Sequence, residues 1–141
     1  MSNLETEPVE TPCRSAGDPG TTVEFFEARA VPLGGVRGIN VKRLLPQRAL
    51  PTVGAWCFLD VFGPHPDGMS VLPHPHTGLQ TVTWPLSGEI RHRDSIGSDV
   101  VLKAGQLNLM TSGRGISHSE FSLGDGVQHG LQLWVALPAE S

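Results

Sequence analysis

Two histidines on one short segment are the first residues whose types and spacing suggest shared chemistry. His74 and His76 stand two residues apart in the stretch LPHPHTGLQTVTW, and a proline precedes each of them. In a strand, residues i and i+2 point to the same face, so the two imidazoles would be neighbours. Proline fixes its own backbone angle and favours extended geometry in the residue before it. The pair therefore predicts half of a metal site on a stiff, extended segment.

A second pair of ligand-type side chains follows later in the chain. His118 and Glu120 occupy alternate positions of GRGISHSEF, so a strand would present both on one face. If the two segments face each other, three imidazoles and one carboxylate converge. Such a set suits Fe(II), Mn(II), Ni(II), Cu(II) or Zn(II), and it leaves positions of a six-coordinate ion open for O2 or substrate. The predicted metal ligands are His74, His76, His118 and Glu120, whereas an H-x-H pair alone would also fit a loop with solvated histidines.

The other histidines are given plainer roles by their surroundings. His65 falls in a Gly/Pro-rich stretch and is predicted to be solvated. His92 falls in the charged run RHRDS and is predicted to lie on the surface at a strand end. His129 fits a satisfied core histidine, or alternatively a partner of a metal ligand. The three tryptophans are expected in the core, with one of them as a wall for an aromatic ligand: Trp56, Trp84 and Trp134.

The elements that must position these residues are predicted to be short strands. The chain has 17 glycines and 12 prolines, and they punctuate short apolar runs. Residues 53–62 are almost all apolar, which fits a strand buried on both faces, and residues 63–68 read as a loop. Ser87-Gly88 is predicted to be the two-residue turn of a hairpin. Prolines cannot donate to a ladder, so the histidine-proline segment is expected at a sheet edge or a barrel mouth. Strands are expected at 36–45, 53–62, 79–86, 89–93, 100–102, 106–110, 116–123 and 131–137.

These strands predict an all-β fold, an antiparallel jelly-roll barrel or sandwich in a single domain. With 141 residues the chain is long enough for one domain, predicted at 22–141, and 1–21 reads as a disordered acidic, proline-containing tail. The net charge of −4 argues against direct contact with nucleic acid. The sequence has no apolar run for a membrane helix, no secretory signal and no disulfide framework in its two cysteines, so a cytoplasmic location is expected.

Long motifs of this chain resemble the pirin family of the cupin superfamily. They are HPHTGLQTVTWPLSGEIRHRDSIG, GQLNLMTSGRGISHSE and HGLQLWVALP, with VPLGGVRGINVKRLLP and WCFLDVFGP upstream. The resemblance runs from about Glu27 to Pro138 and implies an N-terminal cupin domain with one metal ion, usually iron. The family's ligands match His74, His76, His118 and Glu120. Some members are similar in activity to quercetin 2,3-dioxygenases, and others resemble regulators that bind transcription factors or metabolic enzymes.

Two features of the chain depart from the family's pattern. Pirins usually have two cupin domains, whereas this chain corresponds to the first one, and a lone domain is expected to pair with itself to cover an exposed face. Gln80 stands where the family mostly has glutamate. It is expected to tune the pocket or the surroundings of the ligands, and it removes one candidate acid or base.

Three functions follow from these expectations. The first is an iron-dependent dioxygenase acting with O2 on a flavonol-like phenol, in which Glu120 takes the proton of the substrate hydroxyl. The alternative is a non-catalytic iron-binding module that binds a transcription factor or a metabolic enzyme. The third is a cupin scaffold that has lost its metal. Because only neutral imidazoles bind a metal, affinity is expected to fall below about pH 6.

Overall fold

The computed structural model of the chain describes residues 23–33 and 39–140. The predicted disordered tail, 1–21, lies outside these residues, as does Val36 at the start of the predicted strand 36–45. Within the described ranges no helix is long and apolar enough to cross a membrane.

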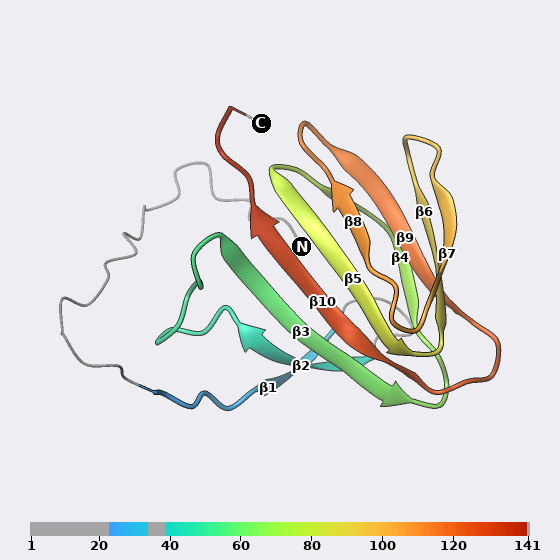
Figure 1. Cartoon of the computed structure of the whole chain (residues 1–141), viewed down its shortest axis with the longest axis horizontal. Coiled ribbons are helices and arrows are strands. Elements are labelled where there is room, and N and C mark those ends of the chain that lie inside the picture. The colour runs from blue at the N-terminus through green and yellow to red at the C-terminus, as the bar shows by residue number, and fades with distance from the viewer. Residues whose placement is uncertain (1–22, 34–38, 141) are drawn as a thin grey trace.

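The described residues form ten strands in two antiparallel sheets (Figure 1). The larger sheet has the order β1-β2-β3-β10-β5-β8, and the smaller one has the order β4-β9-β6-β7. This confirms the predicted all-β, jelly-roll class of fold. The strands are β1 Arg29–Pro32, β2 Asn40–Leu45, β3 Trp56–His65, β4 Ser70–His76, β5 Leu79–Ser87, β6 Glu89–Asp94, β7 Asp99–Lys103, β8 Asn108–Thr111, β9 Ile116–Leu123 and β10 Gln128–Ala136.

The strand with the two histidines lies where its prolines require. β4 is an edge strand of the smaller sheet and pairs only with β9 among the described strands. The bounds predicted for 116–123 are those of β9, the strand that contains the second ligand pair. The two predicted ligand segments are therefore direct neighbours in one sheet.

Two local predictions were wrong. Ser87-Gly88 does not close a hairpin, because β5 belongs to the larger sheet and β6 to the smaller one. The chain crosses between the layers at Gly88, whose φ of 79° suits glycine and whose α-carbon packs against the Gln128 side chain. β3 is not buried on both faces either: its side chains alternate between buried and half-buried, and it continues through Gly63 and Pro64 to His65.

The inner face of the larger sheet carries both apolar and polar side chains, among them Phe62, Asp60 and Thr83. The apolar core lies between the sheets and consists of Val41, Phe62, Met69, Ile90 and Leu102. Elsewhere the interior is polar, as shown by the buried residues Asp60, Thr81, Thr83, His76, His92, His118, Glu120 and Gln128. Buried polar groups are costly unless they are paired, so this part of the interior is expected to be a site.

Candidate metal centre

The register of β9 between its two neighbours brings the chemistry together. His118 lies opposite His74 of β4 and opposite Asp94 of β6. Glu120 lies opposite His92 of β6. Because alternate residues of a strand share a face, these side chains all point between the two sheets.

Three of the four predicted ligands form a tight group. The ligand atoms of His74, His76 and His118 lie within 4.8 Å of one another. Their ring centroids are 4.8 Å apart for His74 and His76, 4.6 Å for His74 and His118, and 5.0 Å for His76 and His118. The sequence prediction that two distant segments aim three imidazoles at one place agrees with this geometry.

The nitrogens of this group fit a metal ion. Nδ1 of His76 and Nε2 of His118 are buried and have no hydrogen-bond partner. Nδ1 of His74 lies 2.8 Å from the carbonyl oxygen of Leu72, to which it donates, so its Nε2 is left with the lone pair. Buried polar atoms normally have partners, and a divalent cation would provide one for each orphaned nitrogen.

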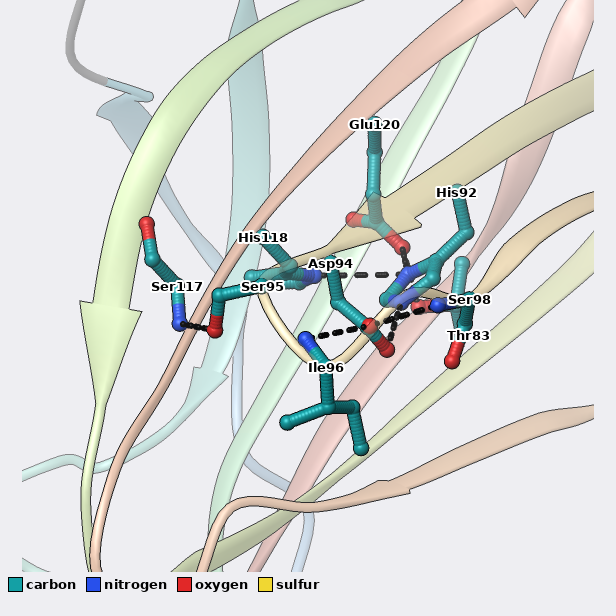
Figure 2. Close-up of polar contacts among 9 residues, drawn as sticks. All are labelled: Thr83, His92, Asp94, Ser95, Ile96, Ser98, Ser117, His118 and Glu120. Atoms are coloured by element: carbon teal, nitrogen blue, oxygen red, sulfur yellow. Dashed lines mark hydrogen bonds and ion pairs between the residues drawn. The ribbon is translucent and has the colours of Figure 1, made fainter.

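Glu120 belongs to a second group of ligand-type side chains, which shares His118 with the three histidines. The ligand atoms of Glu120, His92 and His118 lie within 4.8 Å of one another, and Glu120 lines the same pocket as the three histidines. The Thr83 hydroxyl donates a 2.6 Å hydrogen bond to its Oε1, and Nδ1 of His92 is 3.9 Å from that oxygen. Figure 2 shows the carboxylate pointing toward the His92 ring. The structure thus divides the four predicted ligands between two groups that share His118.

His92 is the residue that the sequence interpretation misplaced. It was expected on the surface, but it is 2% exposed and contacts both His118 and Glu120. The charged neighbours Arg91 and Arg93 point the other way, because alternation places Ile90, His92 and Asp94 on the inner face of β6. That alternation was visible in the sequence EIRHRD and could have located His92 inside.

The pKa values in this cluster follow from burial and from the neighbouring charges. Burial, together with the charges of neighbouring histidines, lowers the pKa of His76 to about 4. Burial likewise lowers the pKa of His118 to about 4, despite the opposing effect of Glu120. Both imidazoles are therefore neutral at neutral pH, which is the form that binds metal.

The contacts of His92 with Glu120 and Asp94 favour the charged forms of His92 and Glu120. Burial alone would lower the pKa of His92, but the carboxylates of Glu120 and Asp94 outweigh it and raise that pKa. Burial would raise the pKa of Glu120, and the His92, His118 and Thr83 contacts outweigh it, so that pKa is lowered. Glu120 is thus a carboxylate at neutral pH and can act as a ligand or as a proton acceptor.

The wall of the pocket facing the histidines is built from stacked rings. Trp134 contacts His76 edge-on at 4.9 Å and stacks on Phe58 at 4.0 Å. The Arg43 guanidinium lies 4.3 Å from the Phe58 ring centroid and makes two 2.8 Å hydrogen bonds to Asp60. Of the three tryptophans, Trp134 is the one that lines the pocket, and Trp56 and Trp84 are 40% and 39% exposed, contrary to the expectation of core positions.

The remaining predicted residues lie away from the cluster. Gln80 donates to the Thr111 hydroxyl in an exposed contact, on the face of β5 opposite to Thr83, so the expectation that it tunes the pocket was wrong. His65 lies at the end of β3, half-buried, with its ring 3.1 Å from the carbonyl oxygen of Asn40, and so is not the solvated loop residue that was predicted.

Known proteins share both the sequence and the fold. The family model described as Pirin matches residues 38–135. A Pseudomonas aeruginosa protein named "Putative quercetin 2,3-dioxygenase" is 53% identical over 118 residues, which cover 80% of this chain and 37% of that protein. A crystal structure of quercetin 2,3-dioxygenase from Acinetobacter baumannii has a TM-score of 0.75 and 46% identity, over 82% of this chain and 40% of that one.

A third similar structure contains a metal. It is a bacterial pirin from Escherichia coli in complex with nickel(II), with a TM-score of 0.61 and 25% identity over 69% of this chain and 44% of that one. The chain spans about two fifths of the length of these relatives.

Proposed function

Because the chain belongs to the pirin family, we propose that it holds one divalent metal ion between His74, His76 and His118, with Glu120 as the fourth ligand. The observation that best supports this is the convergence of three imidazoles with two orphaned, buried nitrogens. Fe(II) is our first choice, and Mn(II), Ni(II), Cu(II) and Zn(II) suit the same nitrogen-rich set. A nickel(II) complex of a similar pirin agrees with this range.

The proposed activity is that of a quercetin 2,3-dioxygenase, which joins O2 to a flavonol-like phenol. Relatives with this activity in their names support it. The metal, when bound, supplies Lewis acidity that lowers the pKa of a coordinated hydroxyl, and open positions for the reactants.

The protein residues contribute binding and proton transfer. Glu120 is an ionised carboxylate within the pocket and would accept the proton of the substrate hydroxyl. Trp134, Met69 and Val71 line the pocket and form apolar walls that suit a flat phenol and exclude water. The three histidines hold the metal and take no part in the proton transfer.

Two variants test the proposal. His74→Ala and Glu120→Ala should each lose most of the bound iron, the turnover of quercetin, or both, while His65→Ala serves as a control histidine outside the cluster. Metal content is measured by elemental analysis and turnover by O2 consumption. Wild-type iron content together with wild-type turnover in both site variants would reject the proposal.

The size of the pocket favours a second candidate function. The cavity measures about 50 Å³, whereas sites for drug-sized ligands usually measure about 300–1,000 Å³. A flavonol would reach the histidines only by one edge or after side chains move. A non-catalytic iron-binding module that binds a transcription factor or a metabolic enzyme needs no such space. Iron-loaded protein that is inactive on several flavonols but binds one purified partner of this kind would favour it.

Self-association is proposed on the outer face of the larger sheet. Cross-strand registers place two apolar rows there: Leu59, Leu133 and Leu109 around Val82, which is already buried, and beside them Val61, Leu131 and Trp84. An apolar sheet face of this kind marks an interaction surface, and a second copy would bury it as sheets pack in sandwiches. Sedimentation of the wild type and of Leu133→Lys tests this: a wild type that stays monomeric at high concentration would reject self-association.

A cytoplasmic location of the protein remains our proposal.

A further inference from the structure

A chain of three side chains continues from the proposed metal group into β6. Nδ1 of His118 lies 3.4 Å from Nδ1 of His92, and Nε2 of His92 lies 3.3 Å from Oδ2 of Asp94 (Figure 2). The side chains of His92 and Asp94 are 2% and 3% exposed, so water does not compete for these contacts. The far end of the chain is the orphaned Nε2 of His118.

Hydrogen-bond chemistry allows one arrangement of protons that leaves this end free for a metal. An ionised carboxylate only accepts, so Asp94 requires the proton of His92 to be on Nε2. When the His92 ring is neutral, its Nδ1 is then an acceptor. Its other neighbour, Oε1 of the ionised Glu120 at 3.9 Å, has no proton to donate, so the proton must come from Nδ1 of His118. The lone pair of His118 is consequently on Nε2, the atom that lacks a partner.

We propose that His92 and Asp94 are positioning residues that set the tautomer of His118 and thereby hold its Nε2 ready for a metal ion. The inference rests on the proposed function in that His118 is a ligand of that site. It also assigns His92 a role different from that of a ligand: both of its nitrogens face protein partners, whereas His118 keeps a free one. Metal-bound histidines generally donate their other N–H to such partners, and losing the partner costs about 10- to 100-fold in affinity.

Asp94 offers a selective perturbation. Its Oδ1 accepts from the backbone N–H groups of Ile96 and Ser98, at 3.1 Å and 2.9 Å, and this contact shapes the turn after β6. In Asp94→Asn the amide oxygen can keep those bonds while the NH2 group faces His92. His92 must then accept at Nε2 and hold its proton on Nδ1. The N–H at Nδ1 of His92 then faces Nδ1 of His118 at 3.4 Å, nearer than Oε1 of Glu120 at 3.9 Å. His118 therefore accepts at Nδ1, and its proton moves to Nε2, where it blocks the metal.

His92 offers the matching control. In His92→Asn, the amide oxygen stands close to where Nδ1 was and can accept from His118 without any help from Asp94. His92→Phe keeps the ring but removes the acceptor. Cobalt(II) affinity, measured by competition with a chromophoric chelator, should fall about 10- to 100-fold in Asp94→Asn and in His92→Phe. It should change less than about threefold in His92→Asn, and adding Asp94→Asn to that variant should have little further effect.

The proton positions can be read without any metal. Long-range 1H–15N spectra of protein with 15N-labelled histidine show which ring nitrogen carries the proton. We expect the His118 proton on Nδ1 in the wild type and in His92→Asn, and on Nε2 in Asp94→Asn. Failure of every form to bind cobalt would reject the proposed function and leave these spectra to decide the inference. A His118 proton that stays on Nδ1 in Asp94→Asn, or an affinity loss in His92→Asn as large as in His74→Ala, would overturn it.

Discussion

The hydrogen bond from Thr83 to Glu120 provides a quantitative test of how the site holds its carboxylate. The hydroxyl donates over 2.6 Å to Oε1, and the two residues are 1% and 4% exposed. Thr83→Val keeps the shape of the side chain but leaves the buried carboxylate without this donor. The unfolded state, in which water hydrates Glu120, is hardly affected.

The expected magnitude follows from the charge of the acceptor. Hydrogen bonds to charged groups contribute about 1.5–3 kcal/mol, so Thr83→Val should lower the free energy of unfolding by about 2 kcal/mol. Loss of this donor should also raise the pKa of Glu120, because the hydrogen bond stabilises the ionised carboxylate. That pKa is lowered in the wild type, and the Thr83 hydrogen bond is one of the causes.

Two measurements and one control check this reasoning. Urea unfolding of the metal-free protein at pH 7 gives the stability change, and carboxyl 13C chemical shifts give the pKa of Glu120. Thr81→Val is the matched control, since Thr81 is buried two residues away on the same strand and the same face. A loss in Thr83→Val below about 0.5 kcal/mol, or an unchanged Glu120 pKa, would refute the role of this hydrogen bond.

Three further predictions concern pH, the buried ion pair and the metal. Acidification from pH 6.5 to 4 should destabilise the metal-free protein, because the pKa values of His76 and His118 are lowered to about 4 and the unfolded state takes up protons first. The expected loss in the free energy of unfolding is about 3 kcal/mol for one such histidine. Constant stability in urea titrations across this pH range would contradict the prediction. Arg43→Met should lower the free energy of unfolding by about 3–5 kcal/mol, because it leaves the buried Asp60 carboxylate unpaired. Adding Asp60→Leu to this variant should restore much of the lost stability. An equal loss in the single and the double variant, measured by chemical denaturation, would contradict this prediction. Nickel(II) at about 100 times its Kd should stabilise the wild type by about 2.7 kcal/mol, seen as a higher Tm, and an equal rise in His118→Ala would place the metal elsewhere.

Most strands and both ligand pairs could be predicted because each depends on local pattern, whereas β1 was not expected. Alternation along a strand fixes which side chains share a face, and this was enough to pair His74 with His76 and His118 with Glu120. It could not show which strands would be neighbours. The false hairpin at Ser87-Gly88 has this cause, since the partners of β5 are β10, more than 40 residues later in the chain, and β8, more than 20 residues later.

The placement of His92 shows a different limit. The charges of Arg91 and Arg93 dominated the composition of this strand, and the alternating pattern that places Ile90 and His92 inside was overlooked. The division of the ligands between two groups was not predictable at all, because it depends on the register of β9 against two strands at once. Local pattern predicted the donors, whereas long-range pairing decides their partners.

The polar interior has a consequence for what holds the two sheets together. Among the described residues, ten buried apolar side chains stand beside ten buried polar or charged ones, so apolar burial alone is a weak source of stability here. Four buried side-chain atoms have no hydrogen-bond partner, and two of them are ring nitrogens of His76 and His118. A metal ion that binds both nitrogens would remove that desolvation cost and cross-link β4 to β9. Metal binding and folding are therefore expected to be coupled in this protein, because two of these four atoms belong to the proposed site.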